Sequence, residues 1–349
     1  VTGPGAGARA LRAPGPPAAA PPSSPPLLSP AHWMTGLFFA RTRVGQRVVG
    51  NRVTNSYEMP EGWNDSISSS TWTGKVGNDD TCVLVLCQPD KSLDLKPSHC
   101  PTHTYVRDFK RTEELVEMLQ SLAVEELQDL MGLGKKIAKS HHERFQHFER
   151  YPAKQACLMF GGEALSAADF GDSDRQFADA HLRLLSGLYG LLRPYDDVKP
   201  VRDLPIRAKL SSKKGGTVGD FWADSVTRQL SKDILELNKR HGQKVLLVVC
   251  LSDEYWRVVQ ASALPPCAEV VRLTFEGASD ESVRRARGLF ARHVVRGRVA
   301  DLEGLRGFSH DDWAPGPAPR GAGLAFLWDG DASGARAPRP SARAAACAP

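Results

Sequence analysis

The segment Leu127–Arg144 combines two glycines and three lysines in a spacing that suits phosphate binding. A short helix is predicted before Gly132-Leu133-Gly134, and Lys135, Lys136 and Lys139 open the next helix. Glycines let a phosphate backbone approach closely, and the free N–H groups at the start of the second helix point toward it. The pattern predicts a helix-hairpin-helix that binds double-stranded DNA independently of its sequence. The alternative is an ordinary helical turn with a solvated lysine face.

Polar side chains that follow short apolar runs form a second candidate site. Ligands of open α/β sheets bind beyond the carboxyl ends of the strands. Several cations with one carboxylate there could hold a phosphate or a carboxylate, so we expect Arg193, Arg202 and Arg287 to surround a common site near Glu254. The alternative is a buried ion-pair network that holds loops. The full candidate anion pocket is Lys91, Arg193, Arg202, Lys209, Ser252, Glu254 and Arg287.

The chain offers no set of catalytic residues that we can defend. It has no Ser/His/Asp arrangement and no phosphate-binding glycine loop with its lysine. The run His99–His103 holds two histidines and a cysteine, but a tetrahedral metal site would need a fourth ligand, for which Cys87 is the candidate, and the run has no second pair of ligands. We therefore expect no metal, no cofactor and a protein that is not an enzyme. The alternative function is an enzyme that acts on an anionic small molecule, phosphate or carboxylate, in the strand-end pocket.

Apolar runs and helical periodicities alternate along the chain, which predicts an α/β fold with a mixed sheet flanked by helices. The helix-hairpin-helix, at 123–150, would be an insertion after the first strand. Ala178, Leu182 and Leu185 recur at helical spacing and predict a helix that ends at Ser186. The predicted strands are 82–87, 155–160, 187–192, 245–251, 269–275 and 322–328, and the other predicted helices are 115–122, 175–185, 222–237 and 281–294.

The two ends of the chain differ in composition from the part between them. Residues 1–80 begin with an Ala/Pro/Gly-rich stretch, and residues 1–57 hold six arginines and no acid. This predicts a disordered or transit-peptide-like extension, with an organelle as the destination it implies. Residues 331–349 are predicted to be a disordered tail, which leaves 81–330 as the folded domain. Because the ends supply more positive charge than the net +5 of the chain, DNA binding must come from a local patch.

Cysteine usage and hydropathy limit the compartment and the partners. The seven cysteines include no C-x-x-C pair and are odd in number, which favours a reducing compartment over a disulfide framework. No apolar run approaches the length that spans a membrane, so we expect no membrane partner.

Five short motifs, in order along the chain, resemble those of the YaaA peroxide-stress family. They are QPDKSL (Gln88–Leu93), LSGLYGLLRP (Leu185–Pro194), GDFWAD (Gly219–Asp224), CLSDEY (Cys250–Tyr255) and ARGLFAR (Ala286–Arg292). The resemblance covers about residues 81–328. Three other family segments are altered here, at Gly162–Leu165, Val201–Ile206 and Phe326–Trp328.

The resemblance implies a DNA-binding protein of the oxidative stress response that limits damage by peroxide and free iron. Members of that family are described as DNA-binding through a helix-hairpin-helix. It also implies a cytoplasmic protein, which we expect to be a monomer.

Overall fold

The computed structural model describes residues 42–49, 52–58, 82–210, 216–310, 312–317 and 323–328. The chain divides into two compact units, Val1–Trp63 and Asn64–Pro349. In the first unit, β1 (Thr42–Val49) and β2 (Arg52–Glu58) pair as an antiparallel hairpin that the sequence patterns did not predict. The expectations of disorder for the rest of 1–80 and for 331–349 lie outside the described residues.

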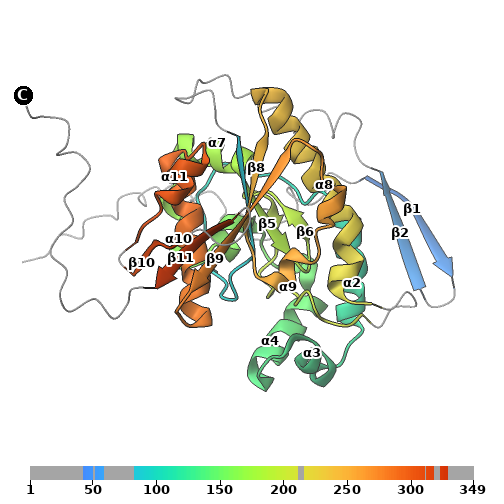
Figure 1. Cartoon of the computed structure of the whole chain (residues 1–349). Helices are drawn as coiled ribbons and strands as arrows, with labels where there is room; N and C mark the ends of the chain where they lie inside the picture. Colours follow the sequence, from blue (N-terminus) through green and yellow to red (C-terminus); the bar gives the residue numbers. More distant parts are fainter. Residues whose placement is uncertain are drawn as a thin grey trace, which may run out of the picture. The chain divides into compact units, whose positions relative to one another are not determined.

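A seven-stranded mixed sheet is the centre of the second unit (Figure 1). Its order is β10-β11-β9-β8-β3-β5-β6, with every internal neighbour parallel and the two outermost strands antiparallel. The predicted α/β class with a mixed sheet is therefore confirmed. The strands are β3 (Val83–Cys87), β5 (Leu182–Ser186), β6 (Gly190–Leu192), β8 (Val245–Cys250), β9 (Ala268–Glu276), β10 (Trp313–Pro315) and β11 (Gly323–Trp328).

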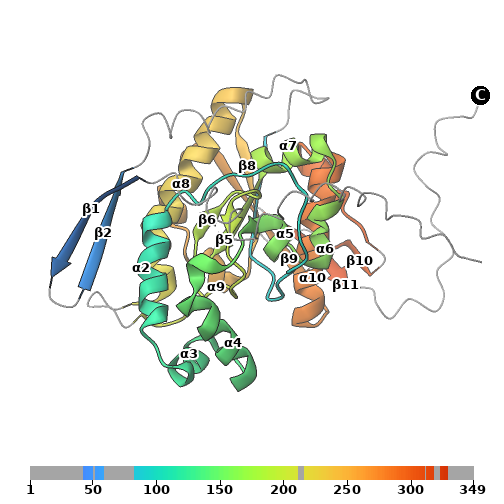
Figure 2. The same cartoon turned by 180° about the vertical axis from the view of Figure 1, so that it is seen from behind.

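Helices cover both faces of this sheet, as Figures 1 and 2 show from opposite sides. Side chains of successive strand residues point to opposite faces, so Leu84 and Leu86 of β3 join one core while Val85 joins the other. Trp222 of α8 packs in the first core and Phe290 of α10 in the second. The main helices are α2 (Phe109–Gln120), α3 (Val124–Met131), α4 (Lys135–Gln146), α7 (Asp172–His181), α8 (Val218–His241) and α10 (Asp280–Gly297).

Shorter elements connect these layers. Two short strands, β4 (Lys154–Gln155) and β7 (Asp197–Val198), pair antiparallel outside the main sheet. The short helices are α5 (Ala156–Phe160), α6 (Gly162–Leu165), α9 (Asp253–Trp256) and α11 (Leu302–Arg306). None of the helices in the described part of the chain has the length and apolar character to cross a bilayer.

The predicted helix over 175–185 is wrong in its second half. Helix α7 ends at His181, and the next five residues form β5, which turns back through Gly187–Tyr189 into the antiparallel β6. All five residues of β5 are buried, so three leucines stand among Arg183 and Ser186 without the regular alternation of a half-buried strand. Such a run fits a buried helix equally well. Gly190 has φ +70°, and a Cβ there would lie 2.7 Å from the ring of Trp222.

The strand predicted over 155–160 is also wrong. Only Gln155 pairs, with Asp197 of β7, and Ala156–Phe160 form the short helix α5. Every residue of this helix is buried, so its apolar run lacks the polar positions that reveal a helical period.

Candidate functional site

The carboxyl ends of β3, β5 and β8 meet at one edge of the sheet, because these strands are parallel neighbours. The loops that leave this edge are tied together. The Ser252 N–H donates a hydrogen bond of 2.9 Å to Oε1 of Gln88, which joins the residue after β3 to the start of α9. Four predicted pocket residues lie in or beside these loops: Lys91, Ser252, Glu254 and Arg287.

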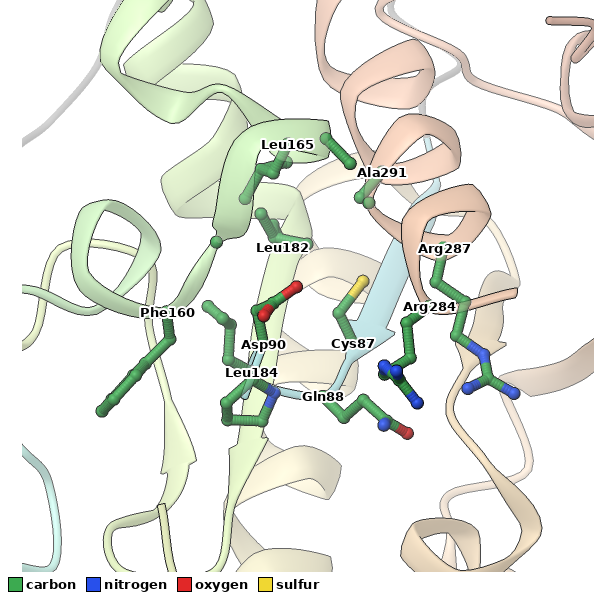
Figure 3. Close-up of a pocket in the computed structure, with 14 residues that line it drawn as sticks. Cys87, Gln88, Asp90, Phe160, Leu165, Leu182, Leu184, Arg284, Arg287 and Ala291 are labelled. Carbon is green, nitrogen blue, oxygen red and sulfur yellow. The ribbon is translucent and has the colours of Figure 1, made fainter. Parts of the chain in front are cut away.

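A cavity opens beside the end of β3, between α10 on one side and α5 and α6 on the other (Figure 3). Its empty space is about 520 Å³, part of it open to solvent. Helices α6 and α10 approach closely at Gly288, where a Cβ would lie 2.7 Å from that of Ala164. The lining comprises Cys87, Gln88, Pro89, Asp90, Phe160, Gly161, Ala164, Leu165, Leu182, Leu184, Arg284, Arg287, Gly288 and Ala291.

The charge of this cavity is mainly positive. Arg284 and Arg287 lie on the same side of it, one turn apart on α10 (Figure 3). In the described part of the chain, neither guanidinium lies within 4 Å of a carboxylate oxygen. The carboxylate of Asp90, also in the lining, accepts hydrogen bonds from the N–H and hydroxyl of Ser92, at 2.8 and 2.6 Å. Two unpaired guanidiniums beside an apolar wall can bind a small anion.

Asp203 is a further polar group at the same edge. Its carboxylate accepts hydrogen bonds from Ser186 Oγ at 2.5 Å and from the N–H groups of Gly187 and Leu188 at 3.0 and 3.1 Å. The Tyr255 hydroxyl lies 3.4 Å from the same carboxylate. Burial raises the pKa of Asp203, although these hydrogen bonds lower it. Asp203 therefore holds the β5–β6 turn, and the sequence patterns did not identify it.

The expectation that Arg193 shares a site with Glu254 is wrong. Because β6 runs antiparallel to β5, Arg193 follows β6 at the level of the start of β5, whereas Glu254 follows the end of β8. Three hydrogen bonds also hold the Arg193 guanidinium away from that edge. It donates to the buried carboxylate of Asp196 at 2.9 and 3.1 Å and to the carbonyl oxygen of Tyr105 at 2.9 Å.

Three other predicted cations, Lys91, Arg202 and Lys209, do not line the cavity either. The Arg202 N–H donates to Nδ1 of His141 on α4, at 3.2 Å, so Arg202 lies beside that helix. Lys209 is exposed and pairs through its backbone with Thr217. Of the predicted pocket, only Arg287 faces the cavity, and Arg284 is the cation that the prediction missed.

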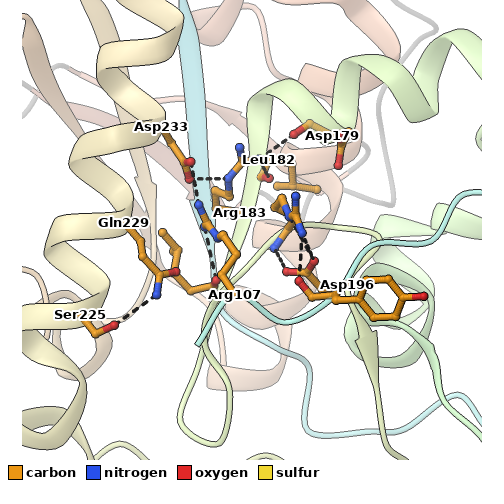
Figure 4. A network of polar contacts seen from close by, with 11 residues as sticks. Arg107, Asp179, Leu182, Arg183, Asp196, Ser225, Gln229 and Asp233 are labelled. Atoms are coloured by element: carbon orange, nitrogen blue, oxygen red, sulfur yellow. Dashed lines mark hydrogen bonds and ion pairs between the residues drawn. The ribbon is translucent and has the colours of Figure 1, made fainter. Parts of the chain in front are cut away.

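A buried ion-pair network lies between α8 and the start of β5 (Figure 4). Asp233 of α8 accepts from Arg183 Nε and from Arg107 Nη1, both at 2.7 Å. Burial alone would raise the pKa of Asp233, but the two guanidiniums lower it below its usual value. A buried ion-pair network is the alternative to a ligand site that the sequence left open, but the network involves other residues than those predicted. A charged residue inside the apolar run of β5 was the signal for it.

Helices α3 and α4 form a hairpin that stands at the end of the domain (Figures 1 and 2). Gly132 ends α3 with φ +60°, Leu133 is buried, and Gly134 precedes α4 in an extended conformation. Nothing lies within 4 Å of the Cβ position of either glycine, so the turn is open to the outside. All three lysines are exposed, and none of them forms an ion pair with a described residue: Lys135, Lys136 and Lys139.

Groups of metal-ligating side chains are lacking in the described ranges: no three His, Cys, Asp or Glu residues there stand close enough to hold an ion. His103 instead pairs with Asp197, with 3.0 Å between Nδ1 and Oδ1.

Comparison with known proteins finds a matching family model and similar sequences. A family model described as "Peroxide stress protein YaaA" matches residues 83–317. A protein named "UPF0246 protein" from Cupriavidus metallidurans is 35% identical over 247 residues, which cover 66% of this chain and 93% of that protein. A protein of the same name from Burkholderia ambifaria is 34% identical over 247 residues, with the same coverage.

Proposed function

Because this chain belongs to the YaaA family of peroxide stress proteins, we propose that it binds double-stranded DNA through the α3–α4 hairpin and limits peroxide and iron damage. The observation that carries this proposal is the open turn Gly132-Leu133-Gly134, followed in α4 by three exposed lysines that form no ion pair with a described residue. Leu133 anchors the turn in the core, while both glycines leave space for a phosphate group. Contacts of this kind reach phosphates and not base edges, so binding would be independent of sequence.

The electrostatics of α4 support an anion at its start. The first N–H groups of a helix have no intrahelical partner, and the helix dipole makes this end positive. Lysine side chains there are unfavourable for the isolated helix, and Gly134 provides no capping side chain. A bound phosphate would accept from the free N–H groups and neutralise the lysines, so it would remove both costs.

The test is duplex binding by the full chain, measured by fluorescence anisotropy with a labelled DNA of random sequence. The triple variant K135E/K136E/K139E should lose binding at moderate salt and keep the circular dichroism spectrum of the wild type. The matched control changes the same charge on exposed lysines elsewhere, K232E/K239E/K244E, and should bind DNA better than the hairpin variant. Wild-type affinity in the hairpin variant would refute the proposal.

A second variant tests the close approach without a change of charge. Gly134 has φ −70° and ψ 148°, a conformation that a β-branched residue adopts readily, and its Cβ position is open. Gly134→Val should therefore fold normally and weaken duplex binding, because the added methyl groups occupy the space of the phosphate. Undiminished binding by Gly134→Val would place the DNA elsewhere.

A small anionic ligand in the α10 cavity is the second candidate function. The observation that favours it is that Arg284 and Arg287 line the cavity and pair with no carboxylate among the described residues. Inorganic phosphate at millimolar concentration should raise the Tm of the wild type, because a ligand that binds only the folded state stabilises it. The double variant R284Q/R287Q should lose this rise. An equal rise in both proteins would assign phosphate to another site.

A further inference from the structure

Two cysteines stand side by side at the carboxyl edge of the sheet. Cys87 ends β3 and Cys250 ends β8, and the two are partners in the parallel pairing of these strands. Both side chains belong to the same core, so both point to the same face. Neighbouring strands lie about 4.8 Å apart. A disulfide spans Cα separations of roughly 4.4–6.8 Å. The backbone therefore already holds these residues at a separation that a disulfide bridges.

The two thiols differ in their access to solvent. Cys87 lines the α10 cavity, beside Arg284 and Arg287, and its sulfur faces that space in Figure 3. Cys250 is completely buried, and its thiol donates to the carbonyl oxygen of Arg287 at 3.5 Å. A small oxidant that enters the cavity thus meets Cys87 first, with Cys250 directly behind it.

We propose that Cys87 and Cys250 form a peroxide-reactive dithiol, in which Cys87 is attacked first and Cys250 resolves the product as a disulfide. The oxidant is hydrogen peroxide or a small alkyl hydroperoxide. This site is independent of DNA binding by the hairpin, and it involves none of the hairpin's residues.

The chemistry balances in two steps. The Cys87 thiolate attacks one peroxide oxygen, an S–O bond forms, the O–O bond breaks, and the leaving hydroxide takes up the thiol proton as water. The Cys250 sulfur then attacks the sulfur of the Cys87 sulfenic acid. An S–S bond forms, the S–O bond breaks, and the second hydroxide leaves as water with the proton of Cys250. Two thiols are oxidised, and one hydrogen peroxide is reduced to two waters.

The surroundings of Cys87 set how fast the first step can be. The hydrogen bond with Cys250 and burial raise the pKa of the Cys87 thiol, whereas the Arg287 guanidinium lowers it. Because the thiolate is the nucleophile, oxidation should become faster as the pH rises from 7 to 9. Arg287→Met should slow it. The loss of the guanidinium raises the pKa of the Cys87 thiol, and the smaller thiolate fraction slows the reaction by more than the higher nucleophilicity of the thiolate restores.

The test uses the reduced full chain, treated with hydrogen peroxide, blocked with N-ethylmaleimide in denaturant, digested and analysed by mass spectrometry. We expect a peptide pair linked through Cys87 and Cys250 that is absent before treatment. Cys82 and Cys157 are both buried, so they should stay reduced during the treatment, be alkylated completely afterwards and serve as internal controls. Full alkylation of Cys87 and Cys250 after treatment, or links to other cysteines, would overturn the proposal without reference to DNA binding.

Variants separate the two roles. Cys250→Ala should accumulate the sulfenic acid on Cys87, which dimedone traps, and Cys87→Ala should leave Cys250 unmodified. The matched control is Cys157→Ala, in the same core, which should still form the link between Cys87 and Cys250. Oxidation of Cys250 in Cys87→Ala at the wild-type rate would contradict the assigned order. Since the wild-type experiment needs no substitution, a variant that fails to fold leaves the test intact.

Discussion

Replacing two arginines separately distinguishes a structural ion pair from a ligand site. Arg193→Ala removes the guanidinium that holds the fully buried carboxylate of Asp196, at 2.9 and 3.1 Å. Breaking a buried pair from one side costs about 3–5 kcal/mol. Asp196 keeps two hydrogen bonds, from Thr104 Oγ1 at 2.7 Å and from the Arg193 N–H at 2.8 Å, so we expect the lower end, about 3 kcal/mol.

Arg287→Ala is the matched substitution. The Arg287 guanidinium faces the cavity and has no carboxylate partner among the described residues, so its loss should change the free energy of unfolding by at most about 0.5 kcal/mol. Urea unfolding at pH 7, followed by tryptophan fluorescence, measures both. In thermal unfolding, Arg193→Ala should lower the Tm by about 6–12 °C. Equal losses in the two variants would refute the distinction between a structural Arg193 and a ligand-facing Arg287.

Three further predictions concern the ion-pair network, a buried histidine and the N-terminal region. Asp233→Ala leaves Arg183 and Arg107 without their carboxylate and should cost about 3–5 kcal/mol, whereas Asp253→Ala, in an exposed pair, should cost under about 1 kcal/mol in the same urea titration. Burial lowers the pKa of His181 to about 4, so the neutral histidine contributes fully to stability above about pH 6.5 and this contribution is lost as the pH falls toward 4. His181→Asn should therefore reduce the decrease in the free energy of unfolding between pH 6.5 and 4. A fluorescent reporter fused after residues 34–80 should reach an organelle, and a diffuse cytosolic signal would exclude targeting by this segment.

Elements that bury one face were predictable from the sequence. The apolar stripe with Leu115 and Leu119 predicts α2, and the stripe with Val226 and Leu230 predicts α8, because only one side of each helix packs against the core. The short strands β3 and β8 were also found, since their apolar runs end at proline or at a turn. Their parallel order follows from the helices that intervene.

Elements buried on every side were not predictable. The run after His181 has no regular polar alternation that separates a strand from a helix, so the sequence predicts a helix through Leu185 where the structure has β5. The mistake also affected the site. With β5 counted as helix, the antiparallel direction of the strand before Arg193 was missed, so Arg193 was expected at the wrong edge of the sheet.

The cavity, too, could be predicted only in part from the sequence. Arg287 was found because it stands in a motif, but Arg284, one turn earlier, lies outside that motif and was not among the predicted pocket residues. The pairing of Cys87 with Cys250 depends on the register of two strands that are 163 positions apart in the sequence. No local pattern contains that register, since the order of the strands in the sheet determines it.

The salt dependence of duplex binding is the sharpest test of DNA binding through the α3–α4 hairpin. Each phosphate contact that a lysine makes adds about 0.9 to the slope of log K against log salt concentration. Wild type and K135Q/K136Q/K139Q should therefore differ in slope by about 2–3 if all three lysines contact phosphates. Both proteins should be titrated with the same DNA at salt concentrations from about 50 to about 200 mM. A difference of this size, with weaker binding by the variant, is the result that the hairpin predicts; identical slopes would contradict DNA binding through α3 and α4.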